Sequence, residues 1–113
     1  MSSPNYPLVL SHQAQADYED ILGVTLHTWG EQQYDRYAAL LNDALLALQD
    51  NPSLGHRPRQ LPARYRCLHV GRHLIVYRFT EGRVHIVRIL HDRMDVRRRM
   101  EESEESFEDN DGD

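Results

Sequence analysis

The chain has 113 residues, 40% of them hydrophobic and 27% charged, with a formal net charge of −5, which suits one compact domain and excludes two independent cores. Its single cysteine excludes an internal disulfide and favours a reducing cytosol. Apolar residues never run together for the roughly 18 positions that a membrane span needs, and the first ten residues lack a signal-peptide pattern, so we expect a cytoplasmic protein without a membrane partner.

Charge is distributed unevenly along the chain. Residues 1–50 hold seven acids and one arginine, residues 51–100 hold twelve arginines and three acids, and residues 101–113 hold eight acids and no base. The three segments therefore have formal charges of −6, +9 and −8. All 13 basic residues are arginines, whose planar fork suits carboxylates and phosphates. The middle segment is thus predicted to meet an acidic partner.

The first half of the chain predicts a strand and two helices. The apolar run at 6–10 is a candidate strand, and Ser11 then stands where a helix N-cap belongs. Apolar residues recur at helical spacing as far as Trp29, where a glycine follows, and again over 34–48. The second helix should end at 51–52, because a residue before proline avoids helical angles. The short joint predicts an antiparallel helical hairpin.

The second half predicts a sheet. The segment 51–64 contains three prolines and a glycine and is predicted to be a loop. Beyond it, the runs at 65–70, 73–79 and 84–90 are rich in β-branched and aromatic residues, and short turns separate them. The predicted fold is therefore α+β, in the order β-α-α-β-β-β, with the helical hairpin packed on a mostly antiparallel sheet. The first strand should pair with the last strand or lie at its edge.

Two-residue turns predict which side chains share a face of this sheet. One face then carries Leu68, Val70, Ile75, Tyr77, Phe79, Val84, Ile86 and Leu90, and should take the helical hairpin. The other face mixes Leu74, Val76, Val87 and Ile89 with Tyr65, His69, Arg78 and His85. This second face is too apolar for water and too polar for a closed core, which favours a partner chain there.

The C-terminal part divides into an arginine cluster and an acidic tail. Asp92 is predicted to cap a short helix that begins at Arg93. Three adjacent arginines follow at 97–99, and both solvated surface charge and target binding remain open for them. The segment 101–113 is too charged to bury a core, so we expect a domain at 1–100 and a disordered tail. The tail could fold back on the arginines as a mild inhibitor or simply aid solubility.

Several of these segments resemble one known family. The order of elements, the NPSLG turn at 51–55, the strand HLIVYR at 73–78 and the ending RILHDRMD at 88–95 are similar to the ParE branch of the ParE/RelE toxin superfamily, over residues 6–98. The resemblance implies a toxin of a type II toxin–antitoxin system that inhibits DNA gyrase, without catalytic residues or cofactors. RelE-like relatives instead cut messenger RNA on the ribosome, and a non-toxic antitoxin-binding module is a further alternative.

The residues favour the inhibitor over the nuclease. A ribonuclease needs groups that move protons and stabilise a phosphorane, and His91 and Arg78 could supply two of them. Lysine is absent, however, and no tyrosine follows Tyr77. The seven histidines show no zinc spacing, so no metal is expected. Few aromatic residues accompany the arginines, which argues against direct, sequence-specific binding of nucleic acid.

The resemblance and the charge pattern together assign two groups of site residues. The arginines predicted to contact the target are Arg93, Arg97, Arg98 and Arg99. The residues predicted to contact the antitoxin are Trp29, Arg64, Arg66 and Arg78. Trp29 continues the buried stripe of the first helix, which favours a core position, although the hinge of the hairpin also fits an antitoxin groove. The antitoxin should be of the ribbon-helix-helix type, within a higher-order toxin–antitoxin hetero-oligomer.

Overall fold

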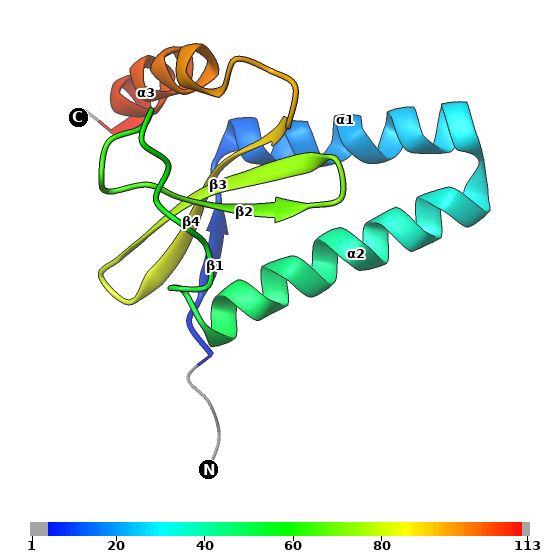
Figure 1. The fold of residues 1–113 in the computed structure, drawn as a ribbon, viewed down its shortest axis with the longest axis horizontal. Coiled ribbons are helices and arrows are strands. Elements are labelled where there is room, and N and C mark those ends of the chain that lie inside the picture. Colours follow the sequence, from blue (N-terminus) through cyan, green and yellow to red (C-terminus); the bar gives the residue numbers. More distant parts are fainter. Residues whose placement is uncertain (1–4, 112–113) are drawn as a thin grey trace.

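The structure, a computed structural model, describes residues 5–111, with side chains for residues 5–103. Its elements are β1 (Leu8–Leu10), α1 (His12–Trp29), α2 (Glu31–Asp50), β2 (Arg66–Val70), β3 (His73–Thr80), β4 (Arg83–His91) and α3 (Val96–Asp111). Figure 1 shows α1 and α2 as an antiparallel hairpin beside the sheet, with α3 at the other side. The predicted α+β fold and its element order are confirmed.

The four strands form one mixed sheet in the order β1-β4-β3-β2 (Figure 1). The pairs β2–β3 and β3–β4 are antiparallel, whereas β1 runs parallel to β4, with Leu8 opposite Val84 and Leu10 opposite Ile86. The expected pairing of the first strand with the last is therefore confirmed. Because β1 has only three residues, it leaves the C-terminal half of β4 open to α1.

The two long helices begin and end where local chemistry requires. The side chain of Ser11 accepts a hydrogen bond from the backbone N–H of Ala14 at 3.0 Å, which satisfies one of the unpaired donors at the start of α1. Gly30 joins α1 to α2 with φ +90°, a backbone conformation that residues with a Cβ atom rarely adopt. Three leucines, Leu41, Leu45 and Leu48, then bury one stripe of α2.

A β-bulge in β4 changes the predicted faces of the sheet. Arg88 pairs with Val76 and Ile86 pairs with Tyr77, so Val87 has no opposite residue. The hydroxyl of Ser11 donates to the Val87 carbonyl at 2.8 Å, so that α1 satisfies a group which β1 is too short to reach. The extra residue reverses the alternation of the side chains that follow it between the two faces of the sheet. Ile89 therefore packs under the hairpin and Leu90 on the other face, the reverse of the prediction.

Each face of the sheet is covered by its own apolar cluster. The cluster under the hairpin includes Ala14, Leu22, Leu41, Leu45, Leu48, Val70, Ile75, Tyr77, Val84, Ile86 and Ile89. The cluster on the second face comprises Leu61, Tyr65, Cys67, Val76, Val87, Leu90 and Met100, with Leu74 and Val96 beside it. The loop before β2 and helix α3 thus cover the apolar part of the second face. The prediction that a partner chain covers those residues is wrong.

Helix α3 differs from the predicted short helix in both its start and its length. It begins at Val96, and the cap is Asp95, whose carboxylate accepts from the backbone N–H of Arg98 at 3.2 Å. The expected cap, Asp92, lies in the preceding loop. The helix continues past residue 100, and Ser103 is fully buried, so a tail that starts at residue 101 is wrong for its first three residues. The side chains after Ser103 lie outside the described residues.

Within residues 5–111, no helix is both long and apolar enough to cross a membrane.

Candidate functional site

A groove of about 940 Å³ lies between the tip of the helical hairpin, the β2–β3 turn and the loop that leads to α3. Its lining residues are Asp17, Asp20, Ile21, Val24, Thr25, Trp29, Gln33, Tyr37, Leu40, Gly71, Arg72, His73, Arg88, Ile89, Leu90, His91, Met94 and Arg99. The hairpin extends past the β2–β3 turn, as Figure 1 shows, so its tip has no sheet beneath it. This overhang creates the groove.

The apolar wall of the groove is unusually exposed. Trp29 is 70% exposed and Val24 64%, while Leu40 and Met94 are 43% and 42% exposed. The core position favoured for Trp29 by the helical stripe is therefore wrong, because the stripe continues beyond the sheet that it would pack on. Large apolar side chains gathered beside polar ones on a surface are typical of a protein-binding site.

The polar wall is a row of aromatic side chains from α2, β3 and β4. The hydroxyl of Tyr37 lies 2.6 Å from Nδ1 of His73, and the ring centroids of His73 and His91 are 5.3 Å apart. The same hydroxyl accepts the backbone N–H of Arg72 at 3.1 Å. Gly71 permits this approach, since a Cβ there would lie 2.7 Å from the Tyr37 oxygen. Burial lowers the pKa of His73, with a further contribution from nearby His91.

A carboxylate ties this row to the edge strand. Asp92 lies 3.2 Å from Nε2 of His69 and 3.4 Å from Nδ1 of His91. The hydrogen bond from His69 is the largest influence on Asp92 and lowers the pKa of that carboxyl group. The Nδ1 atom of His91 also accepts the backbone N–H of Arg93 at 3.1 Å, so His91 holds the loop in place. Sequence reasoning missed Tyr37, His69, His73 and Asp92 as members of one cluster.

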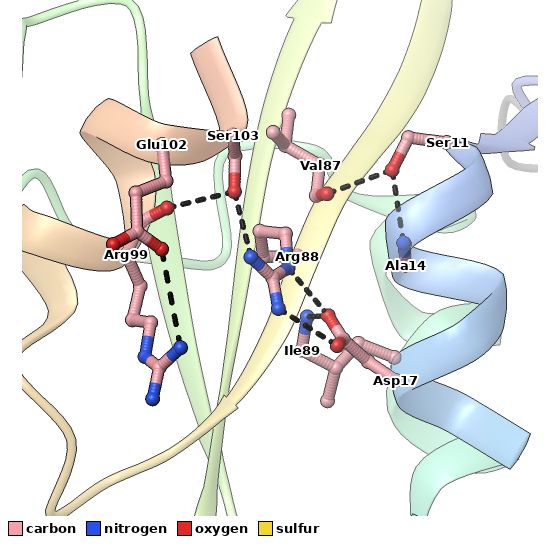
Figure 2. Close-up of polar contacts among 9 residues, drawn as sticks. All are labelled: Ser11, Ala14, Asp17, Val87, Arg88, Ile89, Arg99, Glu102 and Ser103. Carbon is pink, nitrogen blue, oxygen red and sulfur yellow. Dashed lines mark hydrogen bonds and ion pairs between the residues drawn. The ribbon is translucent and has the colours of Figure 1, made fainter. Parts of the chain in front are cut away.

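A polar network joins the groove to both helical layers (Figure 2). Arg88 donates to both carboxylate oxygens of Asp17, at 2.7 and 2.9 Å, and the backbone N–H of Ile89 donates to the same group at 2.9 Å. On its other side, Arg88 donates to the hydroxyl of Ser103 at 2.7 Å. The ion-paired side chains are only 14% and 15% exposed. This network holds α1, β4 and α3 together, and a separation of 71 residues between Arg88 and Asp17 hides it from local sequence patterns.

The four arginines assigned to the target lie close together but in different surroundings. Arg93 is exposed in the loop before α3, and the other three occupy the first turns of that helix. Arg97 pairs with Glu101 at 3.3 Å, while Arg98 and Arg99 each lie 3.9 Å from Glu102. These exposed pairs contribute little to stability. Only Arg99 of the four lines the groove.

The residues assigned to the antitoxin do not form one site. Trp29 lies in the groove, whereas Arg64 and Arg66 line a second pocket of about 420 Å³ where β2 begins and β3 ends. This second pocket, called the basic pocket below, is lined by Tyr6, Asp50, Asn51, Pro52, Ser53, Arg57, Arg64, Arg66 and Phe79. Arg78 lies on β3, half-buried, and lines neither cavity.

The part of the chain that the structure describes contains no cluster suited to a metal ion, and its one cysteine is poorly placed for thiol chemistry. Among residues 5–103, whose side chains the structure describes, no group of three histidine, cysteine or acidic side chains is arranged to hold a metal ion. Cys67 is fully buried on β2, and burial raises the pKa of its thiol to about 11. A thiol in this environment is protonated at neutral pH and therefore a poor nucleophile.

Comparisons with known proteins identify related chains. The family model described as the ParE toxin of the type II toxin–antitoxin system, parDE, matches residues 8–96. Toxin ParE1 of Mycobacterium tuberculosis is 39% identical over 93 residues, which cover 81% of this chain and 95% of the relative. Toxin ParE1 of Caulobacter vibrioides is 35% identical over 91 residues, covering 80% and 94%.

Two solved structures share the fold. A chain of the chromosomal ParDE toxin–antitoxin system from P. aeruginosa superposes with a TM-score of 0.67 at 20% identity, covering 77% of this chain and 96% of that one. A chain of the toxin–antitoxin complex RelBE2 from Mycobacterium tuberculosis gives a TM-score of 0.57 at 21% identity, covering 77% and 98%. The family match ends at residue 96, the first residue of α3.

Proposed function

The chain belongs to the ParE toxins of type II toxin–antitoxin systems, and on this premise we propose that it inhibits DNA gyrase and is neutralised by a cognate antitoxin. The observation that supports an antitoxin partner is the groove, whose apolar wall is exposed in the isolated chain. Inhibition by binding, without catalysis, is the corresponding mechanism.

We propose that the antitoxin inserts an amphipathic helix into the groove. Trp29 and Val24 of the hairpin and Met94 of the opposite loop offer an apolar seat, and the rim supplies the guanidinium groups of Arg72 and Arg99. An antitoxin helix with apolar residues on one face and acidic residues beside them matches this surface. Such a segment, disordered when free, would fold on contact with the groove.

Antitoxin contact at the other residues assigned to it in this chain stays a prediction. Arg64 and Arg66 lie at the other end of β2, so a single antitoxin segment would have to cross the molecule to reach both them and Trp29. Contact between Arg78 and the antitoxin also stays a prediction. The ribbon-helix-helix type of the antitoxin and a higher-order complex are properties of the partner that we continue to expect.

We assign gyrase contact to the arginine surface formed by Arg93, Arg97, Arg98 and Arg99. The exposed fractions of the last three side chains are 70%, 79% and 49%, so their guanidinium groups are available to an acidic or phosphate-bearing target. Arg99 belongs to this surface and to the rim of the groove. An antitoxin seated in the groove would therefore overlap the surface that meets gyrase, which explains neutralisation by exclusion.

Substitutions on each surface separate the two roles. Trp29→Ala should weaken antitoxin binding by ten-fold or more, as truncation of a central aromatic anchor does, while leaving inhibition of supercoiling intact. Arg97→Gln combined with Arg98→Gln should reduce inhibition of supercoiling and leave antitoxin binding within a few-fold. Arg83→Gln, an exposed charge loss at the far end of β4, is the control. Failure of the unmodified toxin to inhibit gyrase would refute the proposal.

A ribosome-dependent ribonuclease remains the second candidate, and one observation favours it. His73 and His91 stand side by side on the groove, with the Tyr37 hydroxyl on one of them, which is a set of groups able to move protons. Against this, His91 already accepts a backbone hydrogen bond, which fits a structural role. Cleavage of message on translating ribosomes that is lost in His91→Gln would establish the nuclease.

A further inference from the structure

The basic pocket has a construction of its own, remote from the groove. It lies where α2 ends at Asp50, beside the start of β2 and the end of β3. The segment before β1 is fixed there by two hydrogen bonds, from the backbone N–H of Tyr6 to the carbonyl of Gln49 at 3.1 Å and from the Gln49 amide to the carbonyl of Tyr6 at 2.9 Å. The walls of the pocket are therefore preformed.

The floor of the basic pocket is aromatic. Phe79, the penultimate residue of β3, is 42% exposed, although most residues of that strand are buried or half-buried. The ring of Tyr6 meets it edge-on, with centroids 4.8 Å apart and planes at 69°. This edge contact holds the Phe79 ring in place while part of its surface stays open. An exposed, fixed ring is a platform on which a planar group can stack.

The walls of the basic pocket are strongly basic. The charged residues of the lining are Arg57, Arg64, Arg66 and Asp50, so the lining has a formal charge of +2. Arg66 is oriented by a hydrogen bond of 3.0 Å from its guanidinium to the carbonyl of Gly55. The guanidinium carbon of Arg64 lies 4.9 Å from the ring centroid of Tyr65. Two of the three cations are thus positioned by the protein before any ligand arrives.

We propose that the basic pocket binds a nucleoside phosphate, with the phosphate against the arginines and the base on Phe79. A phosphate monoester carries close to two negative charges at neutral pH, which matches the charge of the lining better than one carboxylate does. Guanidinium forks pair with phosphate oxygens in two-point contacts. A volume of about 420 Å³ lies near the lower end of ligand pockets, which span roughly 300–1,000 Å³, and suits a single nucleotide.

The ligand could be a free nucleotide or the phosphorylated end of a single strand, since both present the same groups. Neither ligand would occupy the proposed antitoxin groove beside Trp29 or touch the arginine surface of α3, so nucleotide binding can be measured separately from gyrase inhibition and from filling of that groove. Base stacking on one ring is tolerant of sequence, so the pocket would not select among strands by base identity. This agrees with the scarcity of other aromatic residues around the arginines.

Titration of the full-length chain with adenosine 5′-monophosphate, followed by amide chemical shifts and calorimetry, tests the proposal. Arg57→Gln should weaken binding about ten-fold or more, because it removes a charge-assisted contact. Phe79→Leu keeps an apolar floor but removes the stacking platform, and should weaken binding at least about five-fold. The matched control is Arg59→Gln, which removes the same charge from the same loop outside the pocket lining and should leave affinity within about two-fold.

Further ligands separate the sources and the alternatives. Inorganic phosphate should bind more weakly than the nucleotide, because it cannot stack. A 5′-phosphorylated oligonucleotide that binds more tightly than the mononucleotide identifies the strand end, and equal affinity identifies the free nucleotide; both results support the proposal. Equal weakening by Arg57→Gln and Arg59→Gln would show diffuse charge attraction and overturn it. Displacement by an acidic peptide at the same concentration as the nucleotide would overturn it in favour of a protein segment. None of these binding results bears on whether the toxin inhibits supercoiling, which is measured separately.

Discussion

Replacement of Asp17 by asparagine should destabilise the fold more than any other single change of charge on α1. The carboxylate accepts three hydrogen bonds, two from Arg88 and one from the backbone of Ile89, and the two ion-paired side chains are only 14% and 15% exposed. Loss of one partner from a buried pair costs about 3–5 kcal/mol, because the other charge stays buried without its counter-ion. An asparagine carbonyl still accepts one hydrogen bond, and Ser103 still contacts Arg88, so we expect about 2–4 kcal/mol.

Urea unfolding followed by circular dichroism measures this loss, and thermal unfolding should show a fall of roughly 8 °C or more. Asp20→Asn on the same helix removes an exposed carboxylate and should change the free energy of unfolding by less than about 0.5 kcal/mol. Adding Arg88→Met to Asp17→Asn should restore part of the stability, since it removes the stranded charge. If Asp17→Asn and Asp20→Asn unfold at the same urea concentration, the network does not hold the layers together.

Three further predictions concern the turn, the histidine row and the C-terminal helix. Gly71→Ala should cost about 1–3 kcal/mol more than Gly82→Ala in urea unfolding, because both glycines have positive φ but only the first Cβ would meet a tyrosine hydroxyl. The lowered pKa of His73 means that the folded state binds its proton less readily than the unfolded state, so stability should fall as pH drops below the ordinary value of 6.5, and His73→Gln should flatten that dependence. Truncation after Met100 should destabilise the fold by about 1–2 kcal/mol through loss of the Ser103 contact, whereas truncation after Ser103 keeps that contact and should cost less.

The elements of the fold were predictable because their signals are local. Ser11, the glycine after Trp29 and the proline after Asn51 mark helix ends through the geometry of single residues, and all three lie where the structure begins or ends a helix. The faces of β4 were predicted only as far as Val87. Beyond it the bulge in the pairing of β4 with β3 reverses the alternation, and no pattern within β4 reveals it.

The candidate site was less predictable, because it depends on where elements end in space. Trp29 continues an apolar stripe, and the stripe alone cannot show that the sheet stops before it. The middle segment was predicted to meet an acidic partner, yet its Arg88 pairs with a carboxylate of this same chain, and Arg64 and Arg66 line a pocket of their own. The partner of Arg88 is 71 residues away, beyond the reach of spacing rules.

The position of α3 also limits how a partner can approach. The family match ends at residue 96, yet the helix beyond it buries Met100 and Ser103 and closes the second apolar face of the sheet. A partner on that face would have to displace α3 and break its contact with Arg88, and so lose part of its binding energy to unfolding. The groove beside Trp29 demands no such displacement, since its apolar wall is already exposed. An antitoxin that binds there gains the burial of that wall at little cost, which is the physical reason to expect the hairpin side, and not the α3 side, as the place of neutralisation.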